Sequence, residues 1–232
     1  MKNLLLTSFV FLLFTACSTD SEAVIDKNLI SNYEDLETTG ASALGSKNPF
    51  DSTGKEYYNI LQNFLKDNNA PNSAAEINNQ ISFILRFLKG NSTAKAANLG
   101  YSDQEILDIL NDPDTKLIEI IQNSFISSSS KIMLTTFVQN LIVQQDAAYA
   151  VVRDYIIDFD ADIMANADLA ADEKETILTV STISSYALFA EAERKDRDWE
   201  KSVSTKPARP LFKNNQAAIV TVIALLPALI KN

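Results

Sequence analysis

The stretch AAIVTVIALLPALI, residues 217–230, decides how the rest of this chain must fold. It holds no charged residue, while Arg209 and Lys213 precede it and Lys231 follows it. A run of this length is too short to cross a bilayer alone, since a span needs about 20 residues. A helix that is apolar on every face belongs inside a protein. We therefore expect residues 217–230 to form a fully buried central helix, with insertion into a membrane or a partner as the alternative.

Signals for shorter helices begin soon after residue 48. One helix face is predicted by the spacing of Tyr57, Leu61 and Phe64. Ser73 and Glu76 have the spacing of a capping box, in which the serine binds an early backbone N–H and the glutamate reaches back. An apolar stripe follows at Ile77, Ile81, Ile84 and Leu88. We expect this helix to end at Lys89-Gly90, where a cation precedes a glycine.

The chain after residue 100 predicts further helices, two of them long. Ser102 and Glu105 form a second capping box, and Asp112-Pro113 opens the next helix with proline at its first position. One long helix is predicted from about Lys131 to Ala165. A second long helix is predicted from about Leu169 to residue 200, with Asp168 as its cap. That second helix carries acids early and cations late, which suits its dipole.

These signals predict an all-α fold, because the chain shows neither alternating strands nor hairpin turns. We expect an irregular multi-helix bundle with two long helices, formed by residues 48–232 as a single domain. A loop is expected from Ser202 to Pro210, where two prolines interrupt the helical pattern.

The first residues predict export and lipid anchoring. An apolar run from Leu4 to Phe14 follows Lys2, and small residues lead to Cys17, the only cysteine. This arrangement is typical of a secretory signal peptide. The segment Phe14-Thr15-Ala16-Cys17 resembles the lipobox of bacterial lipoproteins, which implies cleavage before Cys17 and acylation of its thiol. We expect a lipoprotein signal peptide at residues 1–16 and a lipidated, flexible tether at residues 17–47.

The amino-acid composition argues against several classes of function. The net charge is −10, whereas nucleic-acid binding needs a basic surface, so no nucleic-acid partner is expected. The chain has no histidine, which removes the commonest general base and metal ligand. It also lacks glycine-rich phosphate loops. We expect no catalytic residue, no cofactor and no metal site.

Two groups of acids have spacings that occur in metal or catalytic sites. Asp158, Asp160 and Asp162 resemble the start of an EF-hand loop, but Ile163 stands where that loop needs glycine, so an exposed acidic helix face is favoured over a calcium site. Glu191, Glu193, Asp196, Asp198 and Glu200 offer paired carboxylates beside Trp199. An exposed helix end is favoured there, with Trp199 as a packing anchor.

Three short motifs resemble lipoproteins of Bacteroidota of the flavobacterial type. They are Asn48-Pro49-Phe50-Asp51-Ser52-Thr53-Gly54, then Glu173-Lys174 with Ile177-Leu178, then Lys195-Asp196-Arg197-Asp198-Trp199-Glu200-Lys201-Ser202-Val203. That family has an N-P-Y/F-D-x-x-G start and a basic R-D-W segment before an apolar tail that is often glycine-rich. The tail of this chain has no glycine. The resemblance implies a source and a lipid anchor, and it carries no activity.

Together these patterns favour a non-enzymatic, lipid-anchored helical protein of the cell envelope. We expect an outer-membrane lipoprotein, either periplasmic or surface-exposed, that binds an envelope protein partner or stabilises an assembly. One alternative is a membrane-active or immunity-type protein that acts through residues 217–230. A second alternative is a carboxylate-dependent hydrolase. The sequence leaves the oligomeric state open.

Overall fold

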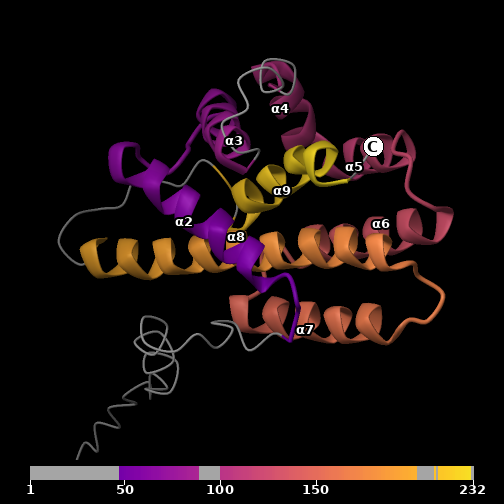
Figure 1. Cartoon of the computed structure of the whole chain (residues 1–232). Coiled ribbons are helices and arrows are strands. Elements are labelled where there is room, and N and C mark those ends of the chain that lie inside the picture. Colours follow the sequence, from indigo (N-terminus) through magenta and orange to yellow (C-terminus); the bar gives the residue numbers. More distant parts are fainter. Residues whose placement is uncertain (1–46, 89–99, 203–211, 213, 231–232) are drawn as a thin grey trace, which may run out of the picture. The chain divides into compact units, whose positions relative to one another are not determined.

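The computed structural model describes residues 47–88, 100–202, 212 and 214–230, and for residues 196–202 it describes the backbone only. All regular structure in this part of the chain is α-helical, which confirms the predicted all-α class (Figure 1). The helices are α2 (Asp51–Asp67), α3 (Ala74–Leu88), α4 (Asp103–Asn111), α5 (Pro113–Gln122), α6 (Ser128–Val143), α7 (Tyr149–Ala165), α8 (Ala171–Ser202) and α9 (Gln216–Leu229).

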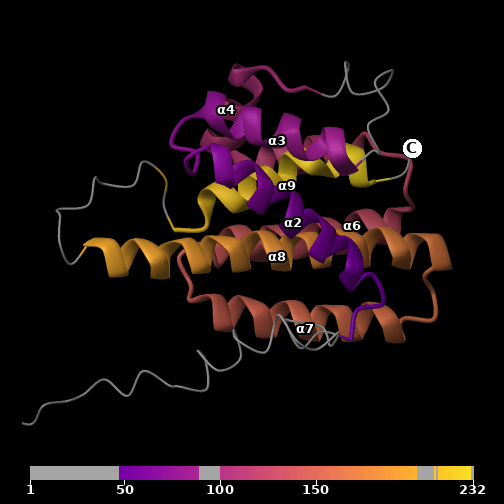
Figure 2. The same cartoon turned by 60° about the vertical axis from the view of Figure 1, so that its left-hand side comes forward.

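The bundle is built around α8 and α9. Helix α8 packs against α2, α6, α7 and α9, while α9 packs against α3, α4, α5, α6 and α8 (Figures 1 and 2). The buried side chains of α9 cover its whole circumference: Ala217, Ile219, Val220, Thr221, Val222, Ile223, Ala224, Leu225 and Leu226. This confirms the expected buried central helix. Five neighbouring helices are needed because every face of α9 is apolar and must be removed from water.

Both capping boxes mark helix starts. At α4 the box is complete: the backbone N–H of Glu105 donates to Ser102 Oγ at 3.2 Å, and that of Ser102 donates to Glu105 Oε2 at 2.7 Å. At α3 only half of it forms as predicted. The Glu76 N–H donates to Ser73 Oγ at 3.3 Å, but the Glu76 carboxylate accepts from Asn72 N–H at 2.6 Å. The expected end at Lys89-Gly90 lies outside the described residues.

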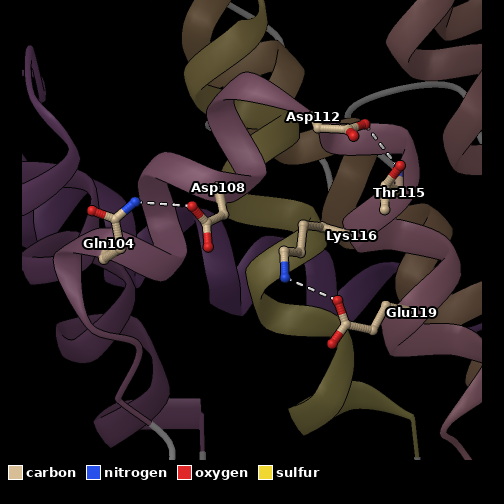
Figure 3. A network of polar contacts seen from close by, with 6 residues as sticks. All are labelled: Gln104, Asp108, Asp112, Thr115, Lys116 and Glu119. Carbon is tan, nitrogen blue, oxygen red and sulfur yellow. Dashed lines mark hydrogen bonds and ion pairs between the residues drawn. The ribbon is translucent and has the colours of Figure 1, made fainter.

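The start of α5 also follows the sequence. Asp112 caps it through a hydrogen bond from the Thr115 N–H to Asp112 Oδ1 at 3.1 Å, with proline at the first helical position. Figure 3 shows the neighbouring polar contacts, which join Gln104 to Asp108 on α4 and Lys116 to Glu119 on α5. These contacts are exposed, so they contribute little to stability.

The predicted long helix over residues 131–165 is wrong, because the chain breaks it into α6 and α7. Gln144, Gln145 and Asp146 offer no apolar side chain to bury, so the core-facing stripe stops after Ile142. In a continuous helix the Gln145 carbonyl would accept from residue 149. Here it accepts from the Asn215 N–H at 3.1 Å, just before α9. Only one of the two expected long helices therefore exists in the described part.

That remaining long helix, α8, begins later than predicted and uses another cap. It starts at Ala171, and Asp168 is not the cap. The Ala170 N–H donates instead to Glu173 Oε2 at 3.1 Å. Ser130 at the start of α6 donates its hydroxyl to Glu173 Oε1 at 2.9 Å. Hydrogen bonds from Ser127, Ala170 and Ser130 hold the pKa of Glu173 below its ordinary value. Glu173 thus joins the starts of α6 and α8.

Candidate functional site

Cys17 lies outside the described residues, as do the signal peptide and most of the tether. Its acylation stays a prediction. Among the described residues, a set of long-range polar contacts surrounds the motif at residues 48–54. We call Asn48, Asp51, Gly54, Asp160 and Tyr186 the entry cluster, because the chain from the N-terminus enters the helical domain there.

Asn48 is the centre of the entry cluster and is 5% exposed. Its Nδ2 donates to Asp160 Oδ2 on α7 at 3.1 Å and to the Leu178 carbonyl on α8 at 2.9 Å. Its Oδ1 accepts from the Phe50 N–H at 2.9 Å. One amide side chain therefore ties the start of α2 to two other helices, which no hydrophobic residue could do.

Asp51 and Tyr186 make the next contact. The Tyr186 hydroxyl donates to Asp51 Oδ2 at 3.2 Å, which joins the first turn of α2 to the middle of α8. Burial raises the pKa of Tyr186, and the negative charge of Asp51 raises it further. The phenol therefore remains a neutral hydrogen-bond donor at physiological pH.

Gly54 lets α2 approach α8 closely. A Cβ at this position would lie 2.5 Å from Cδ2 of Tyr186 and 2.9 Å from the backbone carbonyl oxygen of Thr182. Real Cβ atoms do not come this close to a carbonyl oxygen, so a side chain would force the helices apart. The close packing of α2 on α8 thus requires glycine at the last position of the N-P-F-D-S-T-G motif.

The entry cluster is closed to substrate. Asp160 and Tyr186 are each 2% exposed, so a reacting molecule could not reach the carboxylate or the phenol. Burial of Asp160 also corrects the expectation that residues 158–162 form an exposed acidic face: Asp158 and Asp162 are exposed, but Asp160 points into the core. The arrangement is suited to holding α2, α7 and α8 together.

The sequence carried a signal for the burial of Asp160. Val152, Ile156 and Ile163 are the other buried residues of α7, and Asp160 shares their helix face. A carboxylate on the apolar face of a helix indicates a buried polar partner. The partner, Asn48, lies 112 positions away in the sequence, so spacing alone could not name it.

The paired carboxylates near the end of α8 have separate partners. Glu191 forms an ion pair with Arg194, three residues further along the helix. Glu193 accepts a hydrogen bond at 2.6 Å from the hydroxyl of Tyr58, on α2. The side chains of Asp196, Asp198, Trp199 and Glu200 lie outside the described part of the structure.

Two cavities were found near α9. The first lies between α2, α8 and α9, is lined by Tyr57 and Glu191 among others, and has a volume of about 30 Å³, enough for one water molecule. The second, of about 200 Å³, is lined by Leu85, Tyr101, Glu105 and Pro227 among others. Burial, with the charge of Glu105, raises the pKa of Tyr101 to about 12. Among the described residues, Glu191 is the one carboxylate that lines the first cavity and Glu105 the one that lines the second.

Within the described residues, no group of three or more acids, cysteines or histidines has a geometry that could hold a metal ion. In the same part of the chain, no helix has the length and apolarity that a membrane crossing requires.

Large apolar side chains are exposed at both ends of α6. At its start lie Ile118, Phe125 and Ile132, which are 41%, 84% and 67% exposed. We call these three residues the α5–α6 tip. At its other end lies Val143, the last residue of α6, and Val151 follows on α7; they are 81% and 58% exposed. Between residues 120 and 145 the sequence has a single charged residue, Lys131. The most apolar exposed surface therefore follows α6 and its two connections.

Comparison with known proteins adds no further information: no family model, no curated protein and no solved structure matches this chain.

Proposed function

We propose that this protein is a lipid-anchored component of a bacterial cell envelope, held in the membrane through acylated Cys17, and that it acts by binding a partner. The observation that carries the proposal is the position of Cys17. This only cysteine of the chain ends the apolar run of a signal peptide, in the sequence Phe14-Thr15-Ala16-Cys17. The resemblance to lipoproteins of Bacteroidota supports the same source and location.

The burial of α9 supports this function over the membrane-active alternative. That alternative needed residues 217–230 to leave the domain, yet Ile223, Leu225 and Leu226 have no exposed surface. Pulling the helix out would expose its apolar side chains and those of the five helices around it, at a large free-energy cost. The apolar C-terminal run is thus used for folding.

The polar contacts of the domain also favour binding over catalysis. The buried Asp160 carboxylate holds helices together in the entry cluster, Glu105 belongs to a capping box, and Glu191 is paired with Arg194. Each of these acids therefore has a structural role. The exposed apolar residues along α6 offer surface that an envelope protein could cover.

The test of the anchor is metabolic labelling with a palmitate analogue. We expect the unchanged protein to be labelled and membrane-bound, and Cys17→Ser to be unlabelled and uncleaved at this site. A matched control, the double variant Cys17→Ser with Ser21→Cys, keeps one thiol but displaces it from the end of the signal peptide, and it too should be unlabelled. Labelling of the Cys17→Ser variant would refute the lipid anchor.

A further inference from the structure

We infer that the α5–α6 tip rests in the headgroup region of the membrane to which the lipid anchor holds the protein. This inference rests on the proposed lipid anchor and adds the orientation of the domain on the bilayer. Three observations carry it: the place of the tip relative to the entering chain, its charge, and the length of chain that joins the domain to Cys17.

The tip and the entering chain lie at the same end of α8. Ser130, directly after the α5–α6 connection, donates its hydroxyl to Glu173 near the start of α8. Asn48, where the chain enters the domain, donates to the carbonyl of Leu178. Five helical residues rise about 7.5 Å, so both contacts fall near one end of a helix of 32 residues. Figures 1 and 2 show the α5–α6 connection at the end of α8 where α7 joins it.

The connecting chain keeps the domain within reach of the bilayer. Residues 18–46 are roughly 30 residues, which can span at most about 100 Å. A domain held within that distance meets the membrane at a high effective concentration, so a weak contact is sufficient to orient it. The end of the domain nearest the point of attachment is the one that carries the tip.

The chemistry of the tip suits an interface between water and lipid. Phe125 stands in an uncharged connection, Asn123 to Ser127, with Ile118 and Ile132 exposed on the helices to either side. The one cation, Lys131, donates from Nζ to the Gln122 carbonyl at 2.8 Å, so its ammonium group satisfies the end of α5. An exposed aromatic ring beside small hydroxyl side chains can enter the headgroup region without burying a charge.

Acidic side chains outnumber basic ones around the tip. On α5, α6 and the first two turns of α8, the cations are Lys116, Lys131 and Lys174, and the acids are Asp114, Glu119, Asp172, Glu173 and Glu175. Lys116 pairs with Glu119, and Lys174 donates to the carbonyl of Met164. Attraction to anionic lipid is therefore absent as a driving force, and the contact depends on apolar insertion. The partner we propose is zwitterionic lipid, and we expect the binding of the tip to depend little on salt concentration.

Tryptophan fluorescence provides the test. The acylated protein, carrying Phe125→Trp, is reconstituted into phosphatidylethanolamine–phosphatidylcholine vesicles with and without brominated lipid, and the signal of Trp199 is subtracted using the unchanged protein. We expect a blue-shifted emission and quenching at least threefold stronger than for Val143→Trp, a matched control at the exposed valine that ends α6. Adding phosphatidylglycerol or salt should change neither value.

A second arm separates this inference from the proposed function. Because Cys17 is the only cysteine, the unacylated chain can be coupled through its thiol to a maleimide lipid, and the same variants compared. If cells do not acylate Cys17, this arm still reports on the tip. Equal quenching at positions 125 and 143 would overturn the inference. A blue shift that grows with protein concentration without lipid would assign the tip to a second copy of the chain, and would also overturn it.

Discussion

At Gly54 two opposing effects of one methyl group can be compared. Alanine is the better helix former by about 1 kcal/mol, so at an open position the change to alanine stabilises a helix. Gly54, however, lies in α2 where a Cβ would approach the Thr182 carbonyl to 2.9 Å. Backbone cannot rotate away as a side chain can, so the overlap decides the sign.

We therefore expect Gly54→Ala to lower the free energy of unfolding by about 1–3 kcal/mol, measured by urea denaturation. Gly100→Ala is the matched control. A Cβ there would meet no atom within 4 Å, so its effect should stay within about 0.5 kcal/mol. A Gly54→Ala protein as stable as the unchanged one would mean that α2 and α8 are further apart than described.

Asn48 and Asp160 show what could be foreseen at the scale of single residues. The motif around Asn48 was visible in the sequence, and so was the place of Asp160 among apolar residues on α7. Their hydrogen bond was not, because it joins positions 112 apart and depends on how α2, α7 and α8 pack. The motif around Asn48 suggested a family resemblance, but only the fold shows which contacts its residues make.

At the scale of the helix, capping was the most predictable property. A capping box is local: its donors and acceptors lie within four residues, so its spacing in the sequence is enough to identify it. Both predicted boxes do start helices. The partial form at Ser73 arises because Glu76 bonds the N–H of Asn72 in place of the N–H of Ser73.

The complete capping box at Ser102 should contribute measurably to the stability of the domain. Ser102→Ala should destabilise the domain by about 0.5–2 kcal/mol, and more than Ser73→Ala, because the Ser102 hydroxyl also donates to Glu105 at 2.9 Å. Chemical denaturation measures this, with Ser129→Ala on the exposed surface of α6 as the control. A smaller loss for Ser102→Ala than for Ser73→Ala would contradict the comparison.

The same substitution has a consequence for acid stability. The backbone N–H and the hydroxyl of Ser102 hold the pKa of Glu105 below its ordinary value. A lowered folded-state pKa stabilises the protein above the unfolded-state pKa, and this stabilisation is lost as the pH falls through the folded-state value. Ser102→Ala removes the hydroxyl, so NMR titration should show the pKa of Glu105 rise toward its ordinary value.

The break between α6 and α7 marks the limit of prediction at this scale. The apolar pattern on either side is strong enough to suggest one helix. Between them, the carbonyl of Gln145 accepts a hydrogen bond from the backbone N–H of Asn215, a residue 70 positions later, and not from the next turn of a helix. Helical periodicity contains no information about such a competing partner.

At the scale of the whole molecule, α9 holds the bundle together. Leu226 is fully buried within α9, which contacts five other helices. We expect Leu226→Ala to destabilise the domain by about 2–5 kcal/mol through the lost apolar surface and the cavity it leaves. Leu229→Ala, at a partly exposed position of the same helix, should cost less.

Deletion of residues 217–232 extends that prediction. Thermal unfolding of the unlipidated protein, followed by circular dichroism, should lose its cooperative transition when α9 is absent, because its neighbours would expose their apolar faces. An unchanged thermal midpoint would show that α9 is not part of the core, and would restore the membrane-insertion alternative.

The sequence by itself determined the helical class, most helix starts and the burial of the last helix. These follow from short-range patterns of apolar spacing and capping, and from the cost of leaving an apolar run in water. The tertiary structure decided where α6 ends, why Asp160 is buried and why residue 54 is glycine. Each of those depends on atoms that folding brings together from distant positions in the sequence, and local sequence patterns do not predict such long-range contacts.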